Sequence, residues 1–370
     1  MTARLLVLEA GSGMSSNVMR SLKAGDPSFH IVGCNQSRFF LQKSAADSNY
    51  VLPLESSYAA ALKRIIEGER IDLVIPTTDA DVFRISTLRR KLGCRTFLPR
   101  PSVIKRCSDK YAVSVFLRGH GIPAPQTHPI TKSANLNALF RRFKPSAKLW
   151  CRILSGSGSY GAIPVRTPEQ VRHWIAYWES MRAVPPGSFT LSEYLPGRDF
   201  CVQCLWDKGT LVLAKMAERI IYLDNGSPSG VSSMPAIAKT VLEPNVLDVC
   251  ERAIRALDAK ASGVYFVDVK ENDAGEPCIT EINAGRFAMM TNLHDLTGRH
   301  NMVSTYVRLG MGERVRFPEV HDFGGGHYLV RSVDTLPLIV SKEDLLCSVE
   351  DSDRRMARSA GAKSLVRASS

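Results

Sequence analysis

The sequence predicts two fold classes in one chain, an α/β region at the N-terminus followed by an α+β region. Up to about residue 105, strand and helix patterns alternate regularly, as they do in a parallel, doubly wound sheet. Beyond that point a glycine-rich segment joins two strands directly, and residues 264–282 have the pattern of a β-hairpin. The length of 370 residues suits two or three domains.

The composition is that of an ordinary globular protein with a basic excess. Hydrophobic residues make up 44% of the chain, and no apolar run reaches the roughly 18 residues of a membrane helix. The formal net charge is +12. Because no helix-turn-helix, zinc-finger or RRM pattern is present, this charge favours a polyanionic small ligand such as a nucleotide over nucleic acid. The nine scattered cysteines favour a cytoplasmic location.

The N-terminal region is predicted to alternate strands with helices. The strands are predicted at 5–8, 29–34, 50–52, 71–76 and 95–98, and the helices at 15–23, 58–67 and 79–92. Gly11 and Gly13 follow the first strand as in a dinucleotide-binding fingerprint, but Ser16 stands where its third glycine belongs. We therefore predict a tight strand-to-helix turn and no NAD site.

A polar triplet, Thr77-Thr78-Asp79, follows the strand at 71–76. Ligands usually approach such sheets at the carboxyl ends of their strands, so the triplet is a candidate ligand contact. The alternative is that it only caps the next helix, with Asp79 as the N-cap residue.

The middle of the chain contains a glycine-rich loop between two strands. Helices are predicted at 110–120, 134–143 and 168–181, and strands at 147–154, 162–166 and 189–194. Because a strand and not a helix follows Ser155–Gly161, a P-loop or Rossmann loop is disfavoured. Backbone N–H groups of such a loop can cover nucleotide phosphates, and Arg152 adds a charged donor. The alternative is a flexible surface hairpin.

Several polar residues follow on the next strands. Glu193 is suited to accept a hydrogen bond from an adenine amino group and Asp199 to hold ribose hydroxyls, although both also fit an exposed strand edge. Strands at 201–206 and 211–216 lead to Lys215 and Arg219. A Gly- and Ser-rich loop at 224–233 then offers amides to an anion, or is only a mobile connector. A helix at 244–258 precedes the hairpin.

The hairpin carries a candidate metal site. With its turn centred on Ala274-Gly275, Asp268 lies directly opposite Glu281. Like charges in that position repel each other, and a bound Mg²⁺, which prefers oxygen ligands, would reverse the effect. Asn283 lies on the same face because it is two residues beyond Glu281. The alternative is a solvated hairpin whose carboxylates point into water.

The order of these motifs resembles that of the ATP-grasp superfamily, and within it the ligases related to the carbamoyl-phosphate synthase large chain and to biotin carboxylase. The motifs are Asp109-Lys110, Gly121–Thr127, the glycine-rich hairpin, Glu193–Gly197, and Asp268 with Glu281-Ile282-Asn283. The resemblance covers about residues 4–310. It implies a Rossmann-like pre-ATP-grasp domain at 1–105, followed by a two-lobed ATP-grasp fold with a small lobe at 106–186 and a large lobe at 187–310. Small sheet elements are predicted at 311–350 and a basic disordered tail at 351–370.

The resemblance implies a role for each candidate residue. The nucleotide-binding residues are Lys110, Arg152, Gly156, Ser157, Gly158, Gly161, Glu193, Tyr194, Leu195 and Asp199. The metal ligands are Asp268, Glu281 and Asn283, and the catalytic residues are Arg286, Arg219 and Lys215. Two departures stand out: Arg152 replaces a common lysine, and Asn283 continues into Ala284-Gly285-Arg286 where Asn-Pro-Arg is common. The second departure leaves the placement of Arg286 open.

The implied activity is that of an ADP-forming carboxylate–amine ligase. Such an enzyme uses ATP with Mg²⁺, Mn²⁺ being the alternative ion, to make an acyl phosphate that an amine then attacks. The alternatives are a non-catalytic ATP-binding module and a bicarbonate-activating enzyme that forms carboxyphosphate. The expected partners are a small-molecule carboxylate and an amine, an amino acid being the commonest guess, with a homodimer as the candidate assembly and no membrane or nucleic acid.

Overall fold

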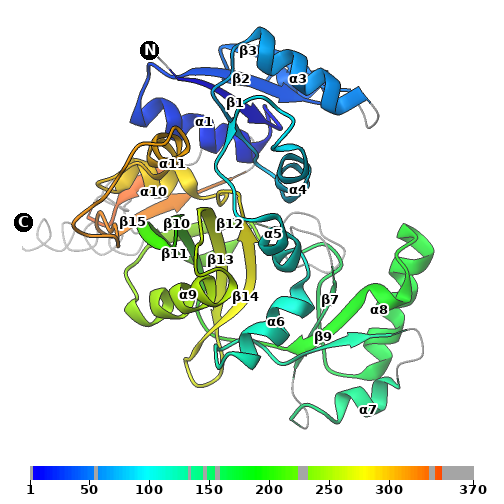
Figure 1. The fold of residues 1–370 in the computed structure, drawn as a ribbon. Coiled ribbons are helices and arrows are strands. Elements are labelled where there is room, and N and C mark those ends of the chain that lie inside the picture. Colours follow the sequence, from blue (N-terminus) through cyan, green and yellow to red (C-terminus); the bar gives the residue numbers. More distant parts are fainter. Residues whose placement is uncertain are drawn as a thin grey trace, which may run out of the picture.

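The computed structural model describes residues 3–53, 57–131, 135–144, 148–154, 159–223, 232–332 and 338–343. Within these ranges the strands form a five-stranded, a four-stranded and a seven-stranded sheet. Figure 1 shows the five-stranded sheet at the top, the seven-stranded sheet in the middle and the four-stranded sheet at the lower right. No helix of the described ranges combines the length and the apolar character that crossing a membrane requires.

The N-terminal sheet is parallel, as predicted, with the strand order β3-β2-β1-β4-β5. Its strands are β1 (Arg4–Leu8), β2 (His30–Asn35), β3 (Ser48–Val51), β4 (Leu73–Ile75) and β5 (Arg95–Thr96). Its helices are α1 (Gly13–Gly25), α2 (Arg38–Leu41), α3 (Tyr58–Gly68), α4 (Asp79–Leu88) and α5 (Pro101–Cys107). Two of these helices, α2 and α5, were not predicted, because each is only one or two turns long.

The start of α4 corrects one prediction. Thr78, and not Asp79, is the N-cap residue: its Oγ1 accepts from the Asp81 N–H at 3.2 Å. The Asp81 carboxylate accepts in return from the Thr78 N–H at 3.3 Å, which completes a capping box. The carboxylate of Asp79 is therefore not used by the cap.

The four-stranded sheet is antiparallel, with the order β6-β9-β7-β8. It contains β6 (Thr127–Ile130), β7 (Leu149–Ile153), β8 (Ile163–Val165) and β9 (Phe189–Glu193), with the helices α6 (Lys110–Gly119), α7 (Leu136–Phe140) and α8 (Pro168–Arg182). Trp174 and Trp178 of α8 are buried against Leu149 and Leu191 in one apolar cluster. This packing fixes the strand that carries Arg152.

The seven-stranded sheet is antiparallel, with the order β14-β13-β10-β11-β12-β15-β16. Its strands are β10 (Asp199–Asp207), β11 (Thr210–Tyr222), β12 (Pro235–Thr240), β13 (Gly263–Glu271), β14 (Pro277–Ala284), β15 (His327–Val330) and β16 (Leu338–Ser341). Its helices are α9 (Pro244–Leu257), α10 (Thr291–Thr297) and α11 (Met302–Gly310). The sequence reasoning missed β12, α10 and α11. The small sheet elements predicted at 311–350 are β15 and β16, which extend this sheet.

Both faces of this sheet are covered. On one face of β10, Val202 and Cys204 pack with Ile254 of α9. On the other face, Leu205 belongs to an apolar cluster that also contains Leu5 of the N-terminal sheet. The five-stranded and seven-stranded sheets therefore share a core, which positions the N-terminal strands next to the hairpin of β13 and β14.

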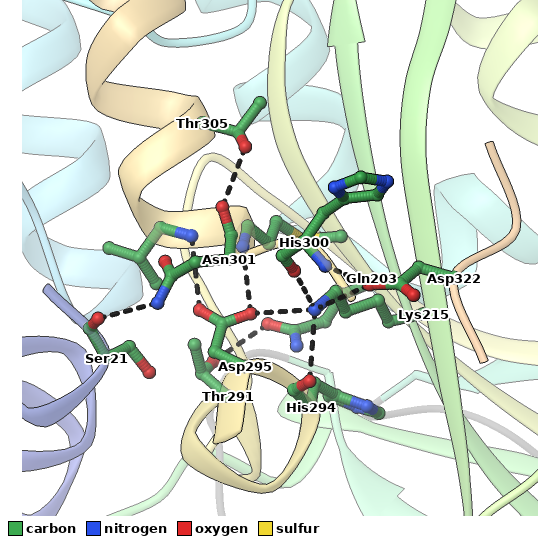
Figure 2. A network of polar contacts seen from close by, with 12 residues as sticks. Ser21, Gln203, Lys215, Thr291, His294, Asp295, His300, Asn301, Thr305 and Asp322 are labelled. Atoms are coloured by element: carbon green, nitrogen blue, oxygen red, sulfur yellow. Dashed lines mark hydrogen bonds and ion pairs between the residues drawn. The ribbon is translucent and has the colours of Figure 1, made fainter. Parts of the chain in front are cut away.

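A buried polar network lies on the same face of the sheet (Figure 2). The ammonium group of Lys215 on β11 contacts Asp295 Oδ1 and Asp322 Oδ2, each at 3.1 Å. It also donates to the backbone carbonyls of His294, at 3.0 Å, and His300. The side chains of all three charged residues are at most 1% exposed.

The two carboxylates of this network hold backbone groups in turn. Asp295 accepts from the N–H groups of Met302 and Val303, at 2.9 and 3.2 Å, and so anchors the start of α11. Asp322 accepts from the N–H group of His300 at 2.9 Å. Lys215 thus neutralises two buried charges that fix the connection between α10 and α11 against the sheet.

We expect Lys215→Met to lower the free energy of unfolding by about 3–5 kcal/mol, because it leaves two carboxylates buried without their cation. Lys239→Met is the matched control, since Lys239 pairs with Glu218 at 3.0 Å on the same sheet but has a side chain 35% exposed. The control should change stability by at most about 1 kcal/mol. Urea unfolding followed by circular dichroism measures both, and equal unfolding midpoints would contradict the buried role of Lys215.

Candidate active site

A cavity of about 900 Å³ lies where the three sheets meet. The loops after β1 and β4 contribute Ser12 and Asp79, the four-stranded sheet contributes Arg152, and the seven-stranded sheet forms the remaining walls. The predicted site residues that line it are Lys110, Arg152, Glu193, Tyr194, Leu195, Asp199, Arg219, Asp268, Glu281, Asn283 and Arg286. Residues separated by up to 176 positions, Lys110 and Arg286, are thus brought to one site.

The hairpin places two acids directly opposite each other. Asp268 on β13 pairs with Glu281 on β14, as predicted. The turn differs from the prediction, because Asn272 Oδ1 accepts from the N–H groups of Ala274 and Glu276, both at 3.0 Å, and forms a longer loop. A β-bulge next to Asp268 compensates for the added residue and preserves the acid pair.

Burial and charge repulsion act together on Asp268. Burial, with the nearby charge of Glu281, raises the pKa of its carboxyl group to about 6, although Arg219 opposes the rise. Asn283 completes the set, with its amide nitrogen 3.5 Å from Asp268 Oδ2. Two ionised carboxylates this close are unfavourable without a cation between or beside them.

Arg219 is the cation that Asp268 contacts in this structure. Its guanidinium group forms ion pairs with Asp268 and, at 2.8 Å, with Asp199. Burial alone would lower the pKa of Arg219, but these two carboxylates raise it well above its usual value. Tyr222 donates its hydroxyl to Asp199, so the acids of this wall are compensated by neighbouring side chains.

Two further cations come from the elements around the four-stranded sheet. Lys110 is the first residue of α6, whose N-terminus is capped by Asp109, and its ammonium group lies 3.4 Å from Glu281. Arg152 on β7 donates to the carbonyl oxygen of Thr280 at 3.1 Å, and burial lowers its pKa. Both side chains therefore reach across the cavity to the hairpin.

The segment after β9 forms another wall. Glu193 accepts from the N–H group of Gln126 at 2.7 Å, so its carboxylate is already hydrogen-bonded. The ammonium group of Lys148 lies 4.0 Å from the centre of the Tyr194 ring, and Leu195 is buried. This wall combines an aromatic and an aliphatic surface with a few polar groups, as pockets for small molecules commonly do.

Arg286 lies between the hairpin and the N-terminal sheet. Its Nε lies 2.6 Å from Asp79 Oδ1, and its second guanidinium nitrogen lies 3.2 Å from Asp79 Oδ2 and 2.6 Å from Asn283 Oδ1. Gly285 makes this approach possible, because its φ is +105° and a Cβ there would lie 2.8 Å from Val82 of α4. The glycine before Arg286 therefore lets the end of β14 pack against α4.

Some predicted residues do not lie at the cavity. Lys215 is not among the lining residues and is held in the buried network below α10, so the structure corrects its assignment as catalytic. Gly161 also lies outside the lining and accepts from Trp174 Nε1 at 3.0 Å. Gly156, Ser157 and Gly158 lie outside the described residues, as do most of the loop at 224–233 and the tail at 351–370.

The sequence reasoning missed part of the lining. The missed residues include Met14, Tyr222, Met234, Met289 and Met290, with Ser12 and Gly13 of the first turn. Methionine and glycine in such positions carry no chemical motif, so only the placement of Thr77-Thr78-Asp79 after a strand pointed to this end of the cavity. That candidate ligand contact does line the cavity.

The acid pair and the amide have the chemistry of a magnesium site. The described ranges hold no group of three or more His, Cys, Asp or Glu side chains suited to a metal ion. Asp268, Glu281 and Asn283 instead offer two carboxylates and one amide. Mg²⁺ commonly binds one or two carboxylates and completes its shell with water and substrate phosphates, so the residues present fit this ion.

Comparison with known proteins identifies the domain. Residues 107–288 match the family model of the ATP-grasp domain. Three solved structures share the fold. The L-amino acid ligase from Bacillus licheniformis has 11% sequence identity and a TM-score of 0.68, and the match covers 89% of this chain and 79% of that one. The biotin carboxylase domain dimer of Hydrogenobacter thermophilus 2-oxoglutarate carboxylase, with MgADP, ADP and bicarbonate, has 16% identity, a TM-score of 0.69 and coverages of 90% and 74%, and N5-carboxyaminoimidazole synthetase from Staphylococcus aureus has 10% identity, a TM-score of 0.66 and coverages of 89% and 82%. Residues 107–288 of this chain therefore belong to the ATP-grasp family of domains.

Proposed function

We propose that this protein is an ATP-dependent ligase that joins a small-molecule carboxylate to an amine through an acyl phosphate and releases ADP and phosphate. The observation that supports this proposal most directly is the charge pattern of the cavity. Lys110, Arg152 and Arg286 surround the pair of Asp268 and Glu281 in an ATP-grasp domain. Such a set balances the charge of a nucleotide, a metal ion and a second anion together.

The nucleotide lies along the cavity in this proposal. Tyr194 and Leu195 face adenine, with Glu193 beside its amino group. Asp199 holds the ribose hydroxyls. Lys110 and Arg152 contact the phosphates, which replace the Glu281 carboxylate and the Thr280 carbonyl oxygen that these cations now contact.

Asp268, Glu281 and Asn283 hold Mg²⁺ or Mn²⁺ in the proposed complex. Bound there, the ion neutralises phosphate oxygens during phosphoryl transfer. The guanidinium group of Arg219 forms an ion pair with the Asp268 carboxylate in this structure. If Asp268 held a metal ion, it would release the guanidinium group of Arg219, which would then be available to the transferred phosphoryl group.

The chemistry follows from the poor electrophilicity of a carboxylate. A carboxylate oxygen attacks the γ-phosphorus of ATP, the bond to ADP breaks, and the resulting acyl phosphate carries a good leaving group. Arg286 and Arg219 stabilise the charge on the transferred phosphoryl oxygens. The amine then attacks the acyl carbon and displaces phosphate.

A homodimer is proposed as the assembly because the Hydrogenobacter domain was solved as a dimer.

The reaction class can be tested with a panel of carboxylates, namely the proteinogenic L-amino acids and bicarbonate, each with Mg-ATP. We expect ADP and phosphate as products, and hydroxylamine should trap the acyl phosphate as a hydroxamate. Chromatography of the nucleotides and the ferric hydroxamate assay provide the measurements. Release of AMP and pyrophosphate would contradict the proposal, and turnover with bicarbonate alone would favour carboxyphosphate formation.

The metal site predicts the behaviour of Glu281→Gln. Loss of one anionic ligand should reduce Mg-dependent ADP formation by at least about 100-fold, the upper end of the effect of residues that merely support metal ligands. Glu276→Gln is the matched control, because Glu276 is an exposed acid in the turn of the same hairpin. Circular dichroism verifies that both variants fold, and full activity in a folded Glu281→Gln protein would disprove the metal assignment.

The raised pKa of Asp268 predicts how metal binding depends on pH. Metal binding requires the ionised carboxylate, so metal affinity reaches its maximum about one pH unit above 6, is about half of that near pH 6, and falls by up to about tenfold per unit at lower pH. Electron paramagnetic resonance of Mn²⁺ with a non-hydrolysable ATP analogue measures this dependence between pH 5 and pH 7. Asp268→Asn supplies the baseline for titration of the nucleotide itself. An identical pH dependence in both proteins would exclude Asp268 as a ligand.

A further inference from the structure

One acid of the cavity comes from the N-terminal region and takes no part in capping its own helix. Asp79 is the first residue of α4 and follows β4, but the helix is capped by Thr78 and Asp81. Its side chain is 48% exposed and lines the cavity. The carboxylate is therefore directed to the site by the helix start without being required for its hydrogen bonding.

The other acids of the cavity are committed elsewhere. Asp199 and Asp268 contact Arg219, and Glu281 contacts Lys110. Glu193 accepts from a backbone N–H group on the distant wall. Asp79 is the remaining acid of the cavity, and it lies across Arg286 from Asn283, because one guanidinium nitrogen contacts both residues.

Asp79 lies next to the group that faces the acyl phosphate. Arg286 donates to both of its oxygens, at 2.6 and 3.2 Å. A carboxylate has about four acceptor positions, so two remain for another donor. A cation bound by Asp79 would be held beside whatever anion Arg286 binds.

Three methionines line the same cavity as Asp79. They are Met14 of α1 and Met289 and Met290, which precede α10. Met289 lies at the start of α1, where its Sδ is 3.7 Å from the position that a Cβ on Gly13 would take. Asn17 donates to the carbonyl oxygen of Met289 at 2.7 Å and so fixes this wall against α1. Flexible thioether side chains adapt to aliphatic and aromatic groups, so the wall suits a ligand with an apolar body.

We propose that Asp79 receives the ammonium group of the amine substrate and that the three methionines contact its body, so that the amine is a primary amine with an apolar skeleton. This inference rests on the proposed ligase function. It assigns the N-terminal sheet the role of binding the nucleophile, whereas the other two sheets bind and activate the acid.

The proton balance of the second step fits this placement. The ammonium group gives one proton to the Asp79 carboxylate, and the neutral nitrogen attacks the acyl carbon. The C–N bond forms and the C–O bond to phosphate breaks, its electron pair leaving with phosphate. Nitrogen loses its second proton to the departing phosphate, and Asp79 returns its proton to water.

The test compares two nucleophiles on the same acyl phosphate. Hydroxylamine is largely uncharged at neutral pH and needs no carboxylate to bind it, whereas an amine substrate arrives as an ammonium ion. Hydroxamate and amide formation are measured with the acid panel, adding hydroxylamine or apolar amines, namely leucine, phenylalanine and isoamylamine. In Asp79→Asn we expect amide formation to fall about 10- to 100-fold more than hydroxamate formation, with a raised KM for the amine. Asp79→Glu should recover part of this loss.

The controls separate the possible failures. Asp248→Asn, an exposed aspartate on α9 that pairs with Arg252 at 3.3 Å, should change neither product. A parallel loss of both products in Asp79→Asn would show that Asp79 only positions Arg286, and equal amide formation would show that it has no part in binding the amine. A wild-type protein that forms hydroxamate but no amide with these amines would refute the apolar class. A wild type that forms no hydroxamate would contradict the proposed function itself.

Discussion

Repulsion between two facing carboxylates is the constraint around which the site is built. Asp268 and Glu281 are held opposite each other by backbone pairing, so neither can move away without disrupting the hairpin. The pair is therefore neutralised from two sides. Arg219 of β11 contacts Asp268, and Lys110 at the start of α6 contacts Glu281. Each acid of the cavity contacts a hydrogen-bond donor or a cation, and a ligand that carries both a metal ion and phosphates can exchange partners with these groups without leaving a charge unpaired.

Local patterns made the hairpin and the N-terminal sheet predictable. Strand alternation and the turn residues identify β13 and β14, and the pairing of the two acids follows from their spacing. The predicted turn was too short, yet the pairing held because a bulge absorbed the added residue. The alternation of buried strands with helices likewise predicted the parallel sheet, since each of its elements is fixed by neighbours in the chain.

Lys215 shows where such reasoning fails. It lies on the same face of β11 as Arg219, four positions away, so strand periodicity cannot distinguish their environments. Arg219 lines the cavity, whereas the segment after Met290 covers Lys215. Neither α10 nor α11 was predicted, and their acids and carbonyls decide the role of the lysine. Asp79 is a residue whose role at the site the sequence could not show. Its contact with Arg286 joins residues 207 positions apart, and only the fold reveals it.

The shared core of the five-stranded and seven-stranded sheets has a consequence for how the protein can unfold and evolve. Leu5 and Val7 lie in the same apolar cluster as Leu205, Leu213 and Val264. Separating the two sheets would expose this cluster to water, so local opening of the N-terminal strands must also loosen the support beneath β10 and β11. We therefore expect the two regions to unfold together. Substitutions that adapt the N-terminal sheet to another ligand must preserve the apolar side chains that pack against the seven-stranded sheet. Such substitutions are therefore confined to the loops at the carboxyl ends of its strands.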